Sequence, residues 1–198
     1  MSDRPPQVFL LRHGQTEWSV AGLHTGRKDV PLTPHGEEEA RKLGPRLRSR
    51  PFAAVFCSPL QRAKRTCELC GFGDVARTLP DLMEWDYGDY EGRRAVEIRA
   101  ARPDWRLFRD GCPGGEKPQD VAARVDHVIP ILTQAGGDVA VFAHGHLLRM
   151  LMGRWLGLAP ELAGRFSLEP ASLSILTRDA HTGDPLLDRW NDIAHLAP

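Results

Sequence analysis

The sequence predicts an α/β fold: a three-layer α/β/α sandwich in which helices cover both faces of a mostly parallel β-sheet. Short apolar runs typical of buried strands alternate along the chain with longer segments of helical periodicity. One central stretch follows neither pattern. The 198 residues contain no internal repeat. We therefore expect a single domain over residues 1–198, large enough to bury roughly 70% of the surface of its unfolded chain.

Five short segments are expected to form the strands. Each is a mainly apolar run bounded by polar residues, glycine or proline. Helical segments lie between most of them, and such a crossover is what a parallel neighbour requires. The expected strands are residues 8–11, 53–57, 139–143, 173–177 and 187–190.

The first long helix is expected to begin after Thr33. A threonine is a suitable N-cap, and Pro34 stands at the first helical position, where a missing N–H costs nothing. The side chains of Ala40, Leu43 and Leu47 fall on one face. We expect that face to pack against the sheet.

Three further helices are expected. One opens at residues 58–61, where Ser-Pro-Leu-Gln matches a capping box with proline at the first helical position. Another runs from about residue 119 to residue 134, with Pro130 causing a kink or an early end. The last follows the strand at 139–143 and carries apolar residues on one side: Leu147, Leu148, Leu151 and Leu156.

Residues 82–118 differ from the rest of the chain. They are rich in Trp, Tyr, Arg, Gly and Pro and contain no clear strand. We expect this segment to be a cap-like insertion of short helices and loops over the functional edge of the sheet. Loops at strand ends carry function more often than the elements they connect.

Composition narrows the choice of partner and compartment. The chain has 26 basic and 26 acidic residues, so a long-range attraction to nucleic acid or to an anionic membrane is not expected. No basic N-terminal region with an apolar core and no apolar run of membrane-spanning length is found. We therefore expect a cytoplasmic protein. The four cysteines are expected to be buried thiols, because a chain of this size does not need disulfides.

Four places in the chain carry residues suited to phosphate chemistry. Arg12 and His13 directly follow the first strand, Arg62 lies in the opening turns of the second helix, Glu84 lies in the insertion, and His144 follows the strand at 139–143. The carboxyl ends of parallel strands meet at one edge of a sheet, where such folds bind ligands. We therefore expect these five side chains to converge.

The sequence around these residues resembles the histidine phosphatase superfamily, also called phosphoglycerate mutase-like. The resemblance covers nearly the whole chain, and the motifs occur in the order found in that family. They are LLRHGQT at residues 10–16, CSPLQRA at residues 57–63, EWDYG at residues 84–88 and AHGH at residues 143–146.

Residue types explain how such a site could act. Arg12 and Arg62 carry planar guanidinium groups that suit bidentate phosphate binding. His13 must be neutral to attack phosphorus, and nearby arginines would lower its pKa. The resemblance implies that His13 becomes phosphorylated and that His144 donates a hydrogen bond to the transferring group. It also implies that Glu84 protonates the leaving oxygen and then activates water. No metal and no cofactor are expected.

Six further positions are expected to contact the substrate or line its pocket. The resemblance implies a hydroxyl or backbone N–H contact at several of them. At residues 19 and 146 this family commonly has asparagine, so a purely structural role there stays open. The six are Ser19, Thr25, Gly26, Tyr87, Gly145 and His146.

Residues 17–26 and 86–92 narrow the resemblance to one branch of the superfamily. These stretches are similar to the branch that contains broad-specificity acid phosphatases and sedoheptulose-1,7-bisphosphatase. The implied function is metal-independent hydrolysis of small phosphorylated metabolites, sugar phosphates or bisphosphates, through a phosphohistidine. A homodimer is a possible assembly.

Three alternatives remain open at this point. The chain could be a mutase, although His144 follows Glu84 by 60 positions, an interval that looks too short for the long insertion of mutases in this family. It could be a non-catalytic domain that binds phosphorylated ligands. The third alternative is a zinc site built on His144 and His146, with Asp86 and Asp138 as the only other candidate ligands.

Overall fold

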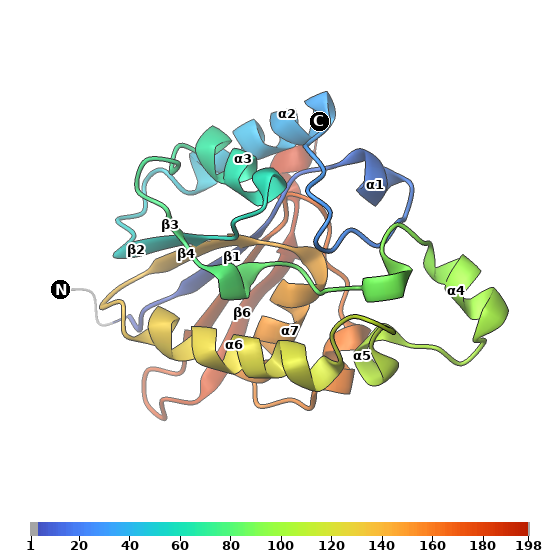
Figure 1. The fold of residues 1–198 in the computed structure, drawn as a ribbon. Coiled ribbons are helices and arrows are strands. Elements are labelled where there is room, and N and C mark those ends of the chain that lie inside the picture. The colour runs from blue at the N-terminus through green and yellow to red at the C-terminus, as the bar shows by residue number, and fades with distance from the viewer. Residues whose placement is uncertain (1–3, 198) are drawn as a thin grey trace.

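The computed structural model describes residues 4–197, so the outermost residues of the expected domain, 1–3 and 198, lie outside the described residues. Its centre is one sheet with the strand order β3-β2-β4-β1-β5-β6 (Figure 1). The strands are β1 (Val8–Arg12), β2 (Ala54–Cys57), β3 (Arg77–Thr78), β4 (Val139–Ala143), β5 (Leu173–Arg178) and β6 (Pro185–Asp192).

The sheet is mostly parallel, as predicted. The pairs β3–β2, β2–β4 and β4–β1 are parallel, whereas β5 runs antiparallel to both β1 and β6. The five expected strands are confirmed to within a few residues at their ends. Strand β3 was not predicted, because its two residues are polar and exposed and carry no apolar pattern.

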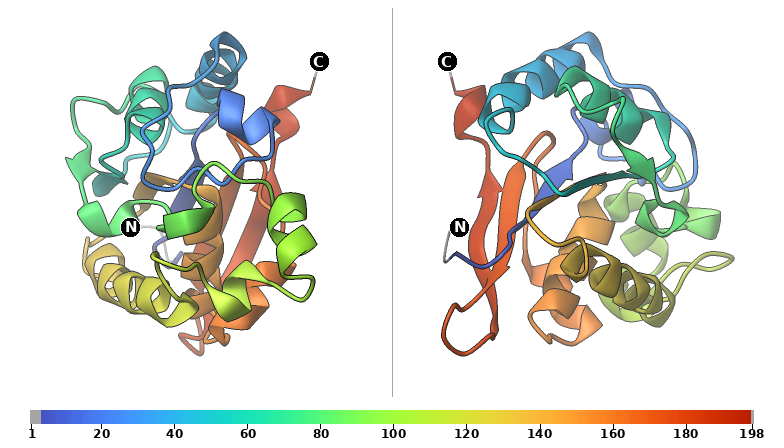
Figure 2. Two further views of the ribbon diagram at one scale, coloured as in Figure 1. Left: turned by 45° about the vertical axis from the view of Figure 1, so that its right-hand side comes forward. Right: turned by 90° about the vertical axis from the view of Figure 1, so that its left-hand side faces the viewer.

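Helices cover both faces of the sheet (Figures 1 and 2). Helices α2 (Pro34–Leu43) and α3 (Gln61–Leu69) lie on one face, and α6 (Pro118–Thr133) and α7 (Gly145–Trp155) lie on the other. Successive side chains of β1 enter opposite layers, because a strand alternates its side chains between the two faces. Phe9 belongs to the cluster that contains Leu43 of α2. Leu10 belongs to the cluster that contains Val125 of α6. The predicted three-layer sandwich is confirmed.

The start of α2 agrees with the sequence. The hydroxyl of Thr33 accepts a hydrogen bond from the backbone N–H of Gly36 at 3.0 Å, and Pro34 occupies the first turn. The expected apolar face is buried at Ala40, Leu43 and Leu47. Helix α6 matches the segment expected at 119–134, and it continues through Pro130 to end at Thr133.

The expected start of α3 is wrong. The helix begins at Gln61 with Leu60 as its N-cap, so Pro59 precedes the helix and no capping box forms. The backbone N–H of Gln61 donates instead to the carboxylate of Asp29 at 2.8 Å. The hydroxyl of Ser58 is bonded to the ring of His144 at 2.7 Å. The side chain of Asp29, from the loop before α2, thus replaces the local cap, and the hydroxyl of Ser58 bonds His144 instead.

The segment 82–118 folds into short helices and loops, as predicted. It contains α4 (Ala95–Ala101), α5 (Leu107–Asp110) and a 3₁₀ turn at Gly88–Tyr90. It extends beyond the sheet next to α1 (Glu17–Val20) (Figure 1). Backbone hydrogen bonds join it to the loop after α1: the N–H of His24 donates to the carbonyl of Arg93 at 3.0 Å, and the N–H of Gly92 donates to the carbonyl of His24 at 2.9 Å.

Two further properties concern the described part of the chain. All four cysteines are buried and free, as expected. Among residues 4–197, no helix is both long enough and apolar enough to cross a lipid bilayer.

Candidate active site

The five expected site residues converge where β1 and β4 end. The backbone N–H of His13 donates to the carbonyl of Ala143, the last residue of β4, at 3.0 Å. This places His13 beside His144, the N-cap of α7, with their ring centroids 5.2 Å apart. A cavity of about 300 Å³ opens here, and its wall includes Arg12, His13, Glu84, Tyr87, Gly145 and His146.

The ring of His13 is held in one tautomer. Its Nδ1 lies 2.8 Å from the carbonyl oxygen of Gly14. A carbonyl can only accept, so Nδ1 carries the proton and Nε2 carries the lone pair. Burial, followed by the charges of Arg62 and Arg12, lowers the pKa of His13 well below its usual value. The site therefore contains a neutral imidazole with one unprotonated nitrogen.

Arg12 is partly buried at the same cavity. One of its terminal nitrogens donates to the carbonyl of Leu168, while its buried Nε has no hydrogen-bond partner among residues 4–197. A Cβ atom on Gly145 would lie 3.3 Å from the guanidinium carbon of Arg12, so glycine at residue 145 leaves room for this group. An unpartnered buried N–H is costly, and an anion in the cavity would satisfy it.

Arg62 and His144 are fully buried and lie behind the cavity wall. Arg62 donates from its terminal nitrogens to the carbonyls of Thr25, Gly26 and Lys28 at 2.9–3.0 Å. Its Nε donates to Nδ1 of His144 at 3.2 Å. Nδ1 of His144 is therefore unprotonated, and its Nε2 donates to the hydroxyl of Ser58. Burial, together with Arg62, lowers the pKa of His144 well below its usual value.

This geometry changes the expectation for His144. The resemblance implies that it donates to a phosphoryl group, but both ring nitrogens already have protein partners. Donation from Nδ1 would require a proton there and a turn of Arg62 away from the ring.

Glu84 is buried with its carboxylate at the N-terminus of α7. One carboxylate oxygen accepts from the backbone N–H groups of Trp85 and Leu147, both at 2.9 Å, and the other accepts from that of His146 at 3.0 Å. The N–H groups at the start of a helix point toward an anion and its dipole favours negative charge. The carboxylate is thus fixed at the cavity wall by backbone donors from two elements.

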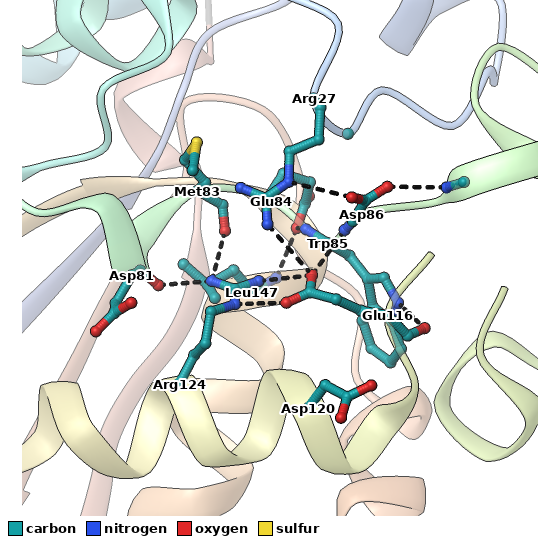
Figure 3. A network of polar contacts seen from close by, with 12 residues as sticks. Arg27, Asp81, Met83, Glu84, Trp85, Asp86, Glu116, Asp120, Arg124 and Leu147 are labelled. Atoms are coloured by element: carbon teal, nitrogen blue, oxygen red, sulfur yellow. Dashed lines mark hydrogen bonds and ion pairs between the residues drawn. The ribbon is translucent and has the colours of Figure 1, made fainter. Parts of the chain in front are cut away.

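The segment around Glu84 is clamped by an ion pair, drawn in Figure 3. Arg124 of α6 donates to both carboxylate oxygens of Glu116, at 2.6 and 2.9 Å, and to the carbonyls of Asp81 and Met83 at 2.7 and 3.0 Å. Glu116 also accepts from the backbone N–H of Asp86 at 2.8 Å. The pair therefore binds the backbone on both sides of Glu84. Sequence analysis missed both residues, since neither lies in a motif.

Tyr87, His146 and His24 line the same cavity as His13. The phenol oxygen of Tyr87 and Nδ1 of His146 share a hydrogen bond of 2.5 Å, and the rings of His24 and His146 stack with centroids 6.2 Å apart. Nδ1 of His24 donates to the carbonyl of Arg93 at 2.6 Å. Burial lowers the pKa of both histidines, that of His146 strongly. Both rings are neutral and offer polar edges that suit a hydroxylated ligand.

Three of the expected substrate contacts are already used within the protein. The hydroxyl of Ser19 lines the cavity but donates to the carbonyl of Thr16 at 2.8 Å, as part of the cap of α1. The hydroxyl of Thr25 donates to the carbonyl of Leu23 at 3.1 Å. The N–H of Gly26 donates to Glu91 at 2.7 Å, and Gly26 lies outside the cavity wall. The expectation that this N–H meets substrate does not fit the geometry.

Arg149 is a further cavity residue that sequence analysis missed. It stands three positions after His146 on α7, and residues three apart share one face of a helix. That spacing was the available signal.

The zinc alternative finds no support in the arrangement of ligands. Among residues 4–197, no three side chains of the metal-ligating types His, Cys, Asp and Glu come together to hold an ion. His144 also lacks a free ring nitrogen.

Comparison with known proteins assigns the family. The model of the histidine phosphatase superfamily (branch 1) matches residues 8–193. An acid phosphatase from Mycobacterium tuberculosis is 37% identical over 179 residues, which cover 88% of each chain. A sedoheptulose 1,7-bisphosphatase from Saccharomyces cerevisiae is 37% identical over 81% of this chain and 71% of its own length. A 2,3-bisphosphoglycerate-dependent phosphoglycerate mutase from Brucella anthropi is 36% identical over 93% and 92%.

Comparison of the fold with solved structures leads to the same family. The solved structure of an open reading frame from Mycobacterium tuberculosis superposes with a TM-score of 0.89 at 35% identity, covering 95% of this chain and 98% of that one. The chain belongs to the histidine phosphatase superfamily, and it is a phosphatase. The expected resemblance to its acid phosphatases and sugar bisphosphatases is confirmed.

Proposed function

We propose that this enzyme hydrolyses phosphomonoesters of small metabolites, sugar phosphates or bisphosphates, through a covalent phosphohistidine on His13 and without a metal ion. The observation that carries the proposal is the neutral His13 ring. Its Nδ1 is engaged with the carbonyl of Gly14, which leaves the lone pair of Nε2 available at a cavity that Arg12 also lines.

The first half of the reaction forms the phosphoenzyme. Nε2 of His13 attacks phosphorus and the bond from phosphorus to the ester oxygen breaks, with its electron pair passing to that oxygen. Glu84, in its protonated form, gives its proton to the departing oxygen. Arg12 stabilises the charge on the remaining phosphoryl oxygens through its unpartnered Nε, and the positive charge of the buried Arg62 adds to this from behind the cavity wall.

The second half regenerates the enzyme. Water attacks phosphorus, the bond between phosphorus and Nε2 breaks, and the carboxylate of Glu84 takes the proton of the water. His144 acts by positioning in the free enzyme, because its ring holds Arg62. A dianionic phosphoryl group near the ring would favour protonation of Nδ1, and His144 would then donate to that group.

The cavity wall supports a hydroxylated substrate. The neutral rings of His24 and His146 and the phenol of Tyr87 line it, together with the N-terminal end of α7 at Gly145. A cytoplasmic location and the single domain over residues 1–198 belong to the same proposal.

The test is transfer of labelled phosphate. The wild-type enzyme should release phosphate from p-nitrophenyl phosphate and, when quenched during turnover with a ³²P-labelled ester, should carry an acid-labile label on His13. His13→Ala should lose both. Label on another residue, or substantial turnover by His13→Ala, would overturn the mechanism.

The same assay separates the two rival functions. A mutase would interconvert phosphoglycerates with little free phosphate, and the identity to a mutase reported above makes this the alternative to exclude. A binding domain would show no turnover from pH 4 to pH 9.

A further inference from the structure

The reactive form of His13 depends on the carbonyl group of a glycine. Nδ1 of His13 donates to the carbonyl oxygen of Gly14 at 2.8 Å, and this bond leaves Nε2 without a proton. Glycine has more backbone freedom than any other residue, so Gly14 by itself would be free to turn its carbonyl away from the ring. The contacts of the two peptide groups beside Gly14 therefore decide how well the ring is held.

The peptide group between His13 and Gly14 is held at both ends. Its carbonyl oxygen accepts from the backbone N–H of Ala171 at 3.0 Å, and its N–H donates to the hydroxyl of Thr66 at 3.1 Å. Thr66 lies on α3 and is fully buried. The same hydroxyl donates to the carbonyl of Arg62, one turn earlier, at 2.8 Å. Its proton therefore points to Arg62, and a lone pair is left for Gly14.

The peptide group between Gly14 and Gln15 is held in a similar way. Its carbonyl oxygen accepts from the ring of His13, and its N–H donates to a carboxylate oxygen of Glu39 at 2.8 Å. Glu39 lies on α2, and its side chain is 12% exposed. A carboxylate bonded to the N–H of an amide polarises that amide, so the carbonyl becomes a better acceptor for the imidazole.

Two successive N–H groups of the loop after β1 thus end on side chains from two helices. Those helices, α3 and α2, lie on the same face of the sheet (Figure 2). Neither Thr66 nor Glu39 lines the cavity, and no step of the proposed reaction uses either side chain. Their shared position behind the loop indicates that they act on its conformation.

We propose that Thr66 and Glu39 are positioning residues for the hydrolysis: together they fix the two peptide groups beside Gly14, and so keep Nδ1 of His13 protonated and Nε2 free to attack phosphorus. The inference rests on the proposed function of His13 as the nucleophile. Neither residue touches the substrate, and both act through Gly14. Without them the carbonyl of Gly14 moves, and the ring is free to take its other tautomer.

The first test removes the hydroxyl of Thr66. Thr66→Val leaves the N–H of Gly14 without its acceptor, whereas Thr66→Ser keeps a hydroxyl there. We expect Thr66→Val to lower kcat for p-nitrophenyl phosphate by about 10- to 100-fold, because misplacing a reacting group by about 1 Å can cost about 10²-fold. KM should stay within about twofold of the wild-type value, since Arg12 is unchanged. Thr66→Ser should restore the wild-type kcat.

Ser174→Ala is the matched control. Ser174 lies on β5 and is fully buried, and its hydroxyl likewise accepts a backbone N–H, that of Asn191 at 3.0 Å. Thr66→Val and Ser174→Ala each remove one buried acceptor, so both should lower the free energy of unfolding, measured with urea, by similar amounts. Only Thr66→Val should lower kcat.

A spectroscopic measurement separates orientation from stability. The chain contains eight histidines. With ¹⁵N in all of them, the long-range ¹H–¹⁵N spectrum shows which ring nitrogen carries the proton, and His13→Ala identifies the signals of residue 13. The wild-type ring should be protonated on Nδ1. Thr66→Val should show both tautomers, whereas Thr66→Ser and Ser174→Ala should keep the wild-type pattern.

Glu39 provides a second, independent pair of variants. Glu39→Gln keeps an acceptor oxygen for the N–H of Gln15 and loses only the charge, whereas Glu39→Leu loses both. We expect Glu39→Leu to lower kcat by about tenfold and to show both tautomers of His13, with Glu39→Gln closer to the wild type in both respects. If Thr66→Val does not fold, this pair decides the proposal.

The outcomes separate this inference from the proposed function. A wild-type enzyme that does not hydrolyse p-nitrophenyl phosphate would overturn the proposed function, and the tautomer of His13 in the variants would then test the positioning alone. The wild-type tautomer in both Thr66→Val and Glu39→Leu would overturn the positioning role, whatever their kcat. Equal losses of kcat in Thr66→Val and Ser174→Ala would also overturn it, because they would show a general loss of stability.

Discussion

Arg62 donates from Nε to Nδ1 of His144 across 3.2 Å, and both side chains are fully buried. The two residues lie 82 positions apart in the chain, one at the start of α3 and one before α7. Their contact therefore ties together the two helices that flank the site on opposite faces of the sheet. It also fixes which nitrogen of His144 carries the proton.

Arg62→Ala should lower kcat for p-nitrophenyl phosphate by roughly 10²–10³, because the site loses both a buried positive charge beside the transition state and the group that holds the ring of His144. It would also leave the carbonyls of Thr25, Gly26 and Lys28 without their donor. Steady-state kinetics and urea unfolding measure the two effects. Arg62→Lys should not restore activity, since a lysine cannot reproduce the planar fork. Full rescue by lysine would contradict the assignment.

Stability should fall as the pH drops below about 6.5. Burial is the main cause that lowers the pKa of His13, His144 and His146 well below the usual value. In the unfolded chain these groups take up protons near pH 6.5, whereas the folded protein keeps them neutral. The unfolded state then binds more protons, so the free energy of unfolding decreases as the pH falls through this window.

The slope can be measured by urea unfolding between pH 5.5 and pH 7.5. Each such histidine adds up to about 1.4 kcal/mol per pH unit. His146→Gln should give a shallower slope than the wild type. A free energy of unfolding independent of pH in this window would contradict the prediction.

Glu84→Gln should slow alkyl phosphates by about 10²–10⁴ and p-nitrophenyl phosphate much less. An alkoxide needs a proton to leave, whereas p-nitrophenolate is a good leaving group. The measurement is kcat for a sugar phosphate and for the aryl ester in the same buffer. Equal losses for both substrates would argue against a role of Glu84 in proton transfer.

Glu116→Gln should act through Glu84. Removing the negative charge of Glu116 frees Arg124, which donates to the carbonyls of Asp81 and Met83 just before Glu84. We expect a loss of about 2 kcal/mol in the free energy of unfolding, because a partly buried ion pair is broken. We also expect Glu116→Gln to slow alkyl phosphates more than p-nitrophenyl phosphate, as Glu84→Gln does, but by a smaller factor.

A second ion pair on α6 provides the control. Asp126 pairs with Arg154 at an exposed site, so Asp126→Asn should change stability by less than about 1 kcal/mol and leave the leaving-group pattern intact. If Glu116→Gln slows all esters by one common factor, the clamp is structural only.

The sequence predicted those features whose signal lies within one segment. Thr33 and Pro34 mark the start of α2 because cap and proline act locally. Arg12 and His13 could be placed because a buried strand ends there. Ser58 misled the analysis, since a hydroxyl can cap a helix or bond a distant ring, and only the fold decides between them. The N–H of Gly26 was likewise taken by Glu91, 65 residues away.

Features assembled from several segments could not be predicted. The two side chains that hold the loop after β1 come from α3 and α2, and neither Thr66 nor Glu39 lies in a motif. The clamp of Glu116 and Arg124 depends on how the insertion packs on α6. In both cases the residue types are common, and their roles become apparent only when the fold brings them together.

The bond that orients His13 has one more consequence. Its acceptor is a main-chain oxygen, that of Gly14, so the imidazole is not bonded at Nδ1 by a side chain. Where a carboxylate side chain fixes the tautomer of a catalytic histidine, one substitution of that carboxylate can disable the histidine. In this protein the backbone conformation at Gly14 fixes the tautomer of His13. The weak point shifts to the loop: a methyl group on Gly14 would lie 2.3 Å from the carbonyl oxygen of Gly36, and the chain would have to move to admit it.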